Sequence, residues 1–135
     1  MLNHYRMFAA YNAWANRTLY TEVGKLDDEA FRRNLGAFFG SLHRTLNHLL
    51  TADRIWLKRF TGEGDAPTSL DAVLHEDFAG LWAARQAEDA RLAAFVDSLT
   101  DGQIRRDITY SPLTNPAVIT HPLEPALTHV FNHQT

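Results

Sequence analysis

The stretch T-H-P-L-E-P-A-L-T-H-V-F-N-H-Q-T, residues 120–135, determines how the rest of the chain is interpreted. Pro122 suits the first position of a helix, where its missing N–H costs nothing, and Glu124 places a negative charge at the positive end of the helix dipole. His129 and His133 follow four residues apart, so they lie one above the other on the same face of the predicted helix. Two imidazoles placed in this way can reach one ion.

This last helix is short. From Pro122 to Thr135 it has about 14 residues, which span roughly 21 Å at the rise of an α-helix. The other predicted helices are longer, so we expect this helix to be incomplete in the chain. One of its sides is apolar, which indicates a face that packs on other helices. This face consists of Leu123, Leu127, Val130 and Phe131.

Length and charge narrow the class of protein. With 135 residues, the chain is expected to form one helical-bundle domain over residues 1–135, long enough for a hydrophobic core. The net charge is −3, and no basic patch or tail occurs. Nucleic acid and anionic membrane surfaces are therefore disfavoured as partners.

The chain has no cysteine, which excludes disulfides, cysteine-ligated zinc and a cysteine nucleophile within it. Asn3, His4 and Arg6 interrupt the apolar residues at the N-terminus, so no signal peptide is predicted. No apolar stretch approaches the roughly 20 residues of a membrane-spanning helix. We expect a cytoplasmic protein.

Three further segments have the apolar spacing of helices. They cover about residues 2–24, residues 41–61 with Ser41 as N-cap, and residues 70–99 with Ser69 as N-cap. The predicted fold class is all-α. The wide apolar surface of the second segment indicates contact with more than one neighbour, as in a helical bundle.

The stretches between these segments have weaker signals. Residues 25–40 are too apolar for a free linker and are expected to pack over the bundle, with a short helical turn at Asp27. Residues 61–67 form an exposed turn, and residues 105–120 a small β-hairpin before the last helix. In the first segment we place Trp14 in the core. The apolar stripe of that segment consists of Phe8, Tyr11, Ala15, Leu19 and Val23.

Several polar residues fall on the predicted apolar faces. Asn12 is interpreted as a buried polar group with a partner, and Asp53 needs an ion pair, a hydrogen bond or a metal ion. In the third segment, Arg85, Glu88 and Asp89 interrupt the apolar stripe, which indicates a buried polar layer. The alternative is an exposed i,i+4 pair of Arg85 and Asp89 that contributes little.

His48 supplies a histidine in the second segment, far from the last helix in sequence. A catalytic metal site usually takes three protein ligands and leaves a position for water, so His48, His133 and one more imidazole would meet its requirement. Bundles build such sites from facing helices. The helical wheel alone places His48 on the flank of its helix, and the alternative is that these are surface or rim histidines. The signatures of zincin proteases, α/β-hydrolases and di-iron bundles do not occur.

Three motifs together resemble the DinB/YfiT-like superfamily. They are Y-N-A-W-A-N at residues 11–16, G-S-L-H through L-N-H at residues 40–48 with Asp53 and Trp56 after it, and H-V-F-N-H-Q-T at residues 129–135. The resemblance covers essentially the whole chain. It implies a four-helix bundle with a long crossover, a homodimer, and a divalent metal ion, nickel or zinc, held by three histidines.

Residue by residue, the resemblance implies two of these ligands in this chain. His48 matches the ligand in the second helix, and His133 matches the first of two in the fourth helix. The other would fall just past Thr135, so either the sequence is an incomplete version or the site is incomplete. His129 is a candidate substitute ligand, although we favour a supporting or structural role for it.

The resemblance also implies a class of reaction. Similar proteins include thiol-dependent S-transferases and a thiol-dependent isomerase, which implies a low-molecular-weight thiol bound to the metal as a thiolate. Water in the same position would support hydrolysis. Asp53 could orient His48 or pair with Arg85. Two functions stay open: a metal-dependent thiol S-transferase or hydrolase acting on a small molecule, and a non-catalytic metal-binding bundle with a structural or stress-linked interaction role.

Overall fold

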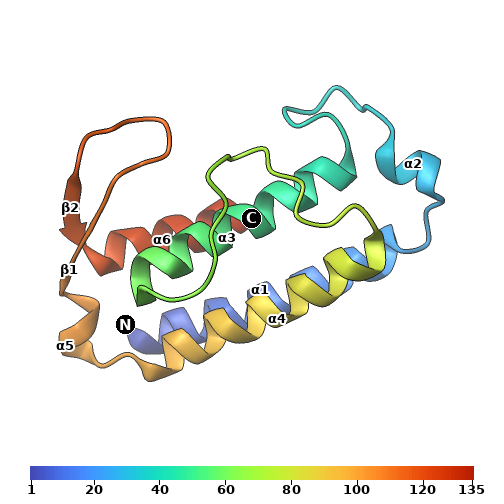
Figure 1. Ribbon diagram of the computed structural model, residues 1–135. Coiled ribbons are helices and arrows are strands. Elements are labelled where there is room, and N and C mark those ends of the chain that lie inside the picture. Colours follow the sequence, from blue (N-terminus) through green and yellow to red (C-terminus); the bar gives the residue numbers. More distant parts are fainter.

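Four helices pack side by side, and a two-stranded hairpin closes one end of the bundle (Figure 1). The structure is a computed structural model that describes residues 1–135. In chain order the elements are α1 (Leu2–Val23), α2 (Asp28–Arg32), α3 (Leu42–Thr61), α4 (Phe78–Ser98), α5 (Asp101–Ile104), β1 (Asp107–Tyr110), β2 (Ile119–Pro122) and α6 (Leu123–Gln134).

The direction of the helices explains the long crossover. In Figure 1, α1 and α6 run one way along the bundle, whereas α3 and α4 run the other way. Because α3 and α4 are parallel, residues 62–77 must return along the whole bundle before α4 begins. The shorter α6 ends near the middle of the bundle, beside α3. The predicted helical bundle with a long crossover and a hairpin before the last helix is confirmed.

The predicted start of the third long helix is wrong. The helix begins at Phe78 rather than after Ser69, and the Asp77 carboxylate caps it by accepting from the N–H of Gly80 at 2.7 Å. Residues 69–77 instead form an irregular segment of turns and bends beside α3. There the Asn47 side chain accepts from two backbone N–H groups of the crossover, at 2.9 and 3.0 Å. These bonds would be lost if the segment were helical, because its N–H groups would then bond within the helix.

The buried face of α1 also differs from the prediction. Trp14 is 55% exposed, so its assignment to the core is wrong, and most of the predicted stripe is exposed as well. The helix is rotated because the side chains of Asn12 and Asn16 turn inward to donate to the Asp89 carboxylate. The buried residues of α1 are Tyr5, Ala9, Asn12, Asn16, Tyr20 and Val23.

A buried polar layer separates the two apolar clusters of the core. Arg85 lies at its centre and pairs with Asp53 on α3 and, at 2.7 Å, with Asp89 on its own helix. The predicted partner for Asn12 and the predicted buried layer are confirmed, and the alternative of an exposed Arg85–Asp89 pair is wrong because both side chains are buried. Burial raises the pKa of Asp53 and of Asp89, and the charge of Arg85 opposes this effect.

The hairpin positions the start of α6. Strands β1 and β2 pair antiparallel, with Asp107 opposite Pro122 and Tyr110 opposite Ile119. Pro122 ends β2 and is also the N-cap residue of α6, so the strand leads directly into the helix.

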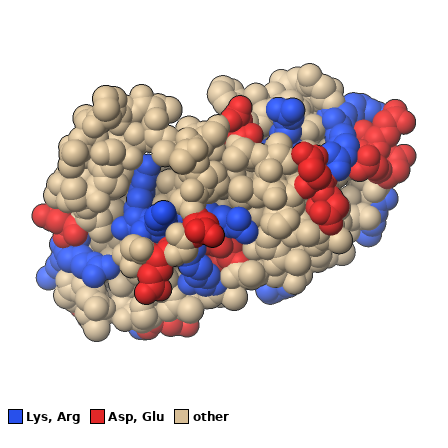
Figure 2. All heavy atoms as spheres, viewed as in Figure 1, with Lys and Arg blue, Asp and Glu red and all other residues tan.

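The surface carries no large region of one sign on the face shown in Figure 2, where acidic and basic side chains are interspersed. Around α2, for example, Arg32 pairs with Asp28 and with Glu76. None of the helices has the length and apolar character needed to cross a membrane.

Candidate metal centre

The structure brings His48 of α3 against His133 of α6. Their Nε2 atoms are 3.3 Å apart, although the two residues are 85 positions apart in sequence. Both rings are partly buried, whereas His129 is exposed. The imidazole edges that face each other are those that could bind one ion together.

The orientation of His48 is fixed from its other nitrogen. Its Nδ1 lies 2.8 Å from the carbonyl oxygen of Leu70 in the crossover, so Nδ1 carries the proton and donates it. Its Nε2 therefore has a free lone pair directed toward His133. The ring of Phe39 stacks on His48 with centroids 3.9 Å apart, which further restricts rotation of the imidazole. A metal-binding histidine is typically held by such a bond from the nitrogen that faces away from the ion.

Asp53 does not orient His48, contrary to one of the two sequence interpretations. It pairs with Arg85, and its Oδ1 accepts a hydrogen bond from Nε2 of Gln134 at 2.6 Å. This bond holds the last turn of α6 against α3, next to His133. Asp53 therefore contributes to the position of His133 through the residue that follows it.

His133 is suited to ligation because it is held neutral. Partial burial lowers its pKa, and His48 and His129 lower it further. A hydrogen bond between the two Nε2 atoms joins the rings in the structure. An ion would replace this hydrogen bond, since neutral imidazoles bind metals through an unprotonated nitrogen.

The separation of the pair agrees with shared coordination. Two tetrahedral ligands at zinc–nitrogen distances of about 2.0–2.1 Å lie about 3.3–3.4 Å apart, which matches the 3.3 Å between His48 and His133. A third ligand is not in place, since no group of three or more His, Asp or Glu side chains is arranged to hold an ion. The ring of His129 packs on Trp56 at 5.4 Å and lies 6.0 Å from that of His133, between centroids. The residues present can thus supply two of the ligands of a metal ion, and its remaining coordination positions stay open.

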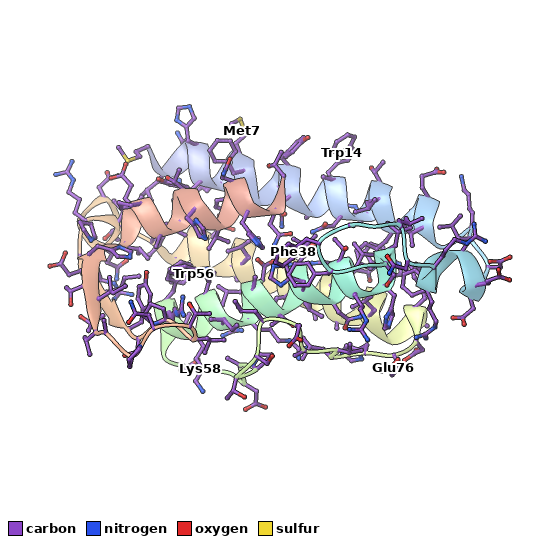
Figure 3. All side chains as sticks on the ribbon, turned by 90° about the horizontal axis from the view of Figure 1, so that it is seen from above. Met7, Trp14, Phe38, Trp56, Lys58 and Glu76 are labelled. Carbon is purple, nitrogen blue, oxygen red and sulfur yellow. The ribbon has the colours of Figure 1, made fainter.

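A cavity of about 430 Å³ opens beside the pair. His48, His133 and His129 line one part of it. Mostly aromatic and aliphatic side chains of α3, of the crossover, of the hairpin loop and of the 33–41 loop line the rest, together with Arg59. Figure 3 shows Trp56 beside α3 toward the hairpin end of the bundle and Phe38 over its middle. A volume of this size is that of a small-molecule site.

Sequence reasoning missed Arg59, which also lines this cavity. A signal was present, because Arg59 follows His48 by 11 residues, or about three turns of helix, and so lies on the same face of α3. Phe39 and Leu70 were missed as well, and no pattern could have found them, because both act from irregular segments.

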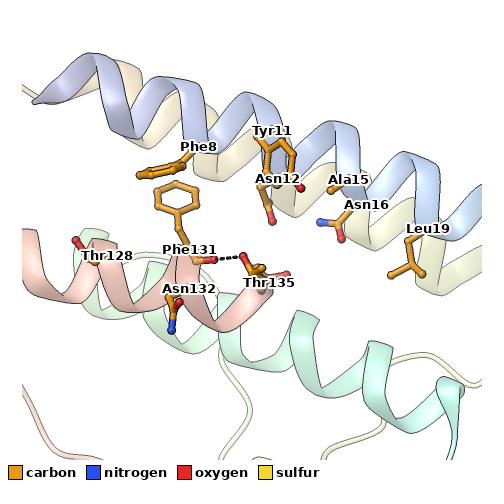
Figure 4. Close-up of a pocket in the computed structure, with 11 residues that line it drawn as sticks. Phe8, Tyr11, Asn12, Ala15, Asn16, Leu19, Thr128, Phe131, Asn132 and Thr135 are labelled. Atoms are coloured by element: carbon orange, nitrogen blue, oxygen red, sulfur yellow. Dashed lines mark hydrogen bonds between the residues drawn. The ribbon is translucent and has the colours of Figure 1, made fainter.

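A second cavity of about 460 Å³ lies between α1 and the end of α6 (Figure 4). Phe8 and Phe131 face each other at one end of it, and Asn12 and Asn16 project into it from α1. No histidine, carboxylate or basic side chain lines this cavity. Of these two cavities, only the first has histidine or charged side chains in its lining.

Two comparisons relate the sequence of the chain to known proteins. The model of the DinB family matches the chain over residues 1–135. Protein DinB of Bacillus subtilis (strain 168) is 25% identical over 140 aligned residues, which cover 93% of this chain and 74% of the relative.

Proposed function

This chain belongs to the DinB family, and on that premise we propose that it binds a divalent metal ion between His48 and His133 and acts as a metal-dependent thiol S-transferase or hydrolase on a small molecule. The observation that carries the proposal is the 3.3 Å separation of the two Nε2 atoms. Facing imidazoles on two helices are a common arrangement for a metal ion in a bundle.

The identity of the ion follows from the donor set. Imidazole nitrogen suits zinc and nickel, whereas magnesium and calcium favour oxygen ligands. No carboxylate takes part in the His48–His133 pair, so we propose nickel or zinc.

Two protein ligands leave positions for a small molecule. When bound, the ion would supply a deprotonated thiol as nucleophile, or hydroxide for hydrolysis. The protein's own residues contribute orientation and shielding from water. Leu70 and Phe39 hold His48, and the apolar walls of the cavity reduce the access of solvent to the pair.

The cavity favours an enzyme over the alternative of a non-catalytic metal-binding bundle. In a purely structural site the ion would be enclosed by protein ligands. Here the histidine pair faces a cavity of about 430 Å³, large enough for a small-molecule thiol.

Metal content tests the proposal. Untagged protein should contain about one equivalent of zinc or nickel by mass spectrometry after saturation and dialysis, and His48→Ala and His133→Ala should contain almost none. His4→Ala is the matched control, because His4 is exposed on α1 and lies outside the cavity. Equal metal in the wild type and in both site variants, or no metal in the wild type, would refute the proposed site.

The thiol step needs a separate measurement. In the cobalt-substituted protein, a low-molecular-weight thiol should produce thiolate-to-cobalt charge-transfer absorption, which is lost in His133→Ala. Absorption that does not change when thiol is added would argue against a thiol-dependent reaction and favour hydrolysis.

A further inference from the structure

We propose that Arg59 binds a carboxylate of the small molecule that occupies the cavity, so that the ligand is an elongated monoanion with its reactive end at His48 and His133. This inference rests on the proposed function for the position of the reactive end. The anion-binding role of Arg59 can be tested without a metal ion.

Arg59 is held in place by aromatic rings and has no counter-charge. Its guanidinium carbon lies 4.5 Å from the ring centroid of Trp56 and 4.2 Å from that of Tyr110. The Tyr110 hydroxyl is in turn fixed by His121, whose Nε2 lies 2.9 Å away. Partial burial lowers the pKa of Arg59, and no carboxylate offsets this effect. Stacking therefore orients a guanidinium whose N–H groups remain free for a ligand.

Among the arginines of this protein, a partly buried guanidinium without an acidic partner is unusual. Four arginines are buried or partly buried, and three of them have acidic partners. Arg85 pairs with Asp53 and Asp89, Arg91 with Glu88 at 2.8 Å, and Arg54 with Glu88 at 3.9 Å. Arg59 alone is partly buried without a partner, and it is also the one that lines the cavity with the histidine pair.

The dimensions of the cavity set the shape of the ligand. Arg59 and His48 lie on the same face of α3, about 16 Å apart along the helix axis at 1.5 Å per residue. The wall between them is apolar and includes Ala52, Ile55 and Leu113. A ligand that reaches both ends therefore has a central part without charge.

The charged side chains that line the cavity favour a carboxylate as the ligand group. No acidic side chain lines the cavity, so a cationic ligand would have no counter-charge there. A guanidinium presents paired N–H donors that match the two oxygens of a carboxylate. Arg59 is the only arginine or lysine in the lining, so a phosphate dianion would keep one charge uncompensated in an apolar site.

The experiment compares octanoate with octanol, which have chains of equal length, by titration calorimetry on metal-free protein. The wild type should bind octanoate about 10- to 100-fold more tightly than octanol, because charge-assisted hydrogen bonds form only with the carboxylate. In Arg59→Met the ratio of the octanoate affinity to the octanol affinity should fall close to one. Arg59→Lys should restore part of this ratio. Lys58→Met is the matched control, because it removes the same charge from an exposed neighbour on α3 and should keep the wild-type ratio.

The location of binding is checked by the indole N–H signal of Trp56 in a proton–nitrogen spectrum, which octanoate should shift in the wild type. A ratio near one in the wild type, or an unchanged ratio in Arg59→Met, would overturn the proposal. An equal loss in Lys58→Met would also overturn it, since the effect would then be general surface electrostatics.

A second comparison separates this inference from the metal proposal. In cobalt-loaded protein, ω-mercaptooctanoate should bind more tightly than ω-mercaptooctanol, with thiolate-to-cobalt absorption in both cases. If the octanoate preference holds but no metal binds at His48, the role of Arg59 stands and the metal site fails. If metal and thiol bind without any carboxylate preference, the metal site stands and the role of Arg59 fails.

Discussion

Replacement of Arg85 by methionine should destabilise the protein strongly. The Arg85 side chain is 1% exposed and carries the only positive charge that contacts Asp53 and Asp89. Removal of one partner from a buried ion pair costs about 3–5 kcal/mol, because the remaining charges stay buried. At about 2.1 cal/mol/K per residue, 135 residues give an unfolding entropy of about 0.28 kcal/mol/K. The melting temperature should therefore fall by about 11–18 °C.

The dependence of this loss on pH identifies its cause. Burial raises the folded-state pKa of Asp53 and Asp89 above the unfolded value, and loss of Arg85 raises both further. A carboxyl group with a raised folded pKa stabilises the fold below its unfolded pKa, and this contribution is lost as the pH rises through the folded pKa. The loss of free energy of unfolding in Arg85→Met, relative to the wild type, should therefore be largest near neutral pH. This deficit should shrink as the pH is lowered toward about 4.5.

Thermal and urea unfolding, followed by circular dichroism from pH 4.5 to 7, measure this deficit. Lys58→Met is the control, since Lys58 is exposed and unpaired, and it should change stability by less than about 0.5 kcal/mol. Addition of Asp53→Asn and Asp89→Asn to Arg85→Met should recover part of the loss at neutral pH. A deficit of equal size at both ends of the pH range would refute the reasoning, because it would show that Arg85 contributes packing rather than charge compensation.

Three further predictions test other features of the structure, the last of them with a control substitution. Gln134→Met removes the bond that holds the end of α6 to α3 and should weaken metal binding at His133 by about tenfold, as measured by competition with a chelator. Asn47→Ala removes a buried side chain with four hydrogen bonds, three of them to the crossover, and should cost about 2–3 kcal/mol in urea unfolding; a cost under 1 kcal/mol would contradict this. Gly62→Ala, at a φ of 74°, should cost about 1–2 kcal/mol, whereas Gly102→Ala, at a negative φ with free space, should be neutral or slightly stabilising.

Local signals were sufficient to predict most of the helices. Ser41 caps α3 by accepting from the N–H of Arg44, and Gly62 ends the helix with a left-handed conformation, so both limits follow from neighbouring residues. The start of α4 could not be predicted, because residues 69–77 are apolar enough for a helix. They stay non-helical because side chains of a different element, Asn47 above all, bind their backbone.

The candidate site shows the same division between local and tertiary causes. The i,i+4 spacing of His129 and His133 suggested a shared ion, yet the structure turns His129 toward Trp56 and pairs His133 with His48 instead. The helical wheel placed His48 on a flank because it considers one helix by itself. The approach of α6 and of the crossover makes that flank an interface. The homodimer implied by the family resemblance stays a prediction.

The attachment of the crossover to α3 provides a probe of motion at the site. The backbone amides of Leu74 and His75 bond to the side chain of Asn47 rather than to another strand or to a helix. They can exchange with solvent when the crossover lifts from α3, and we expect a movement that includes Leu70 to free Nδ1 of His48 as well. Deuterium uptake at these two amides should therefore report how often His48 loses its bond to Leu70, and a bound metal ion should slow that uptake.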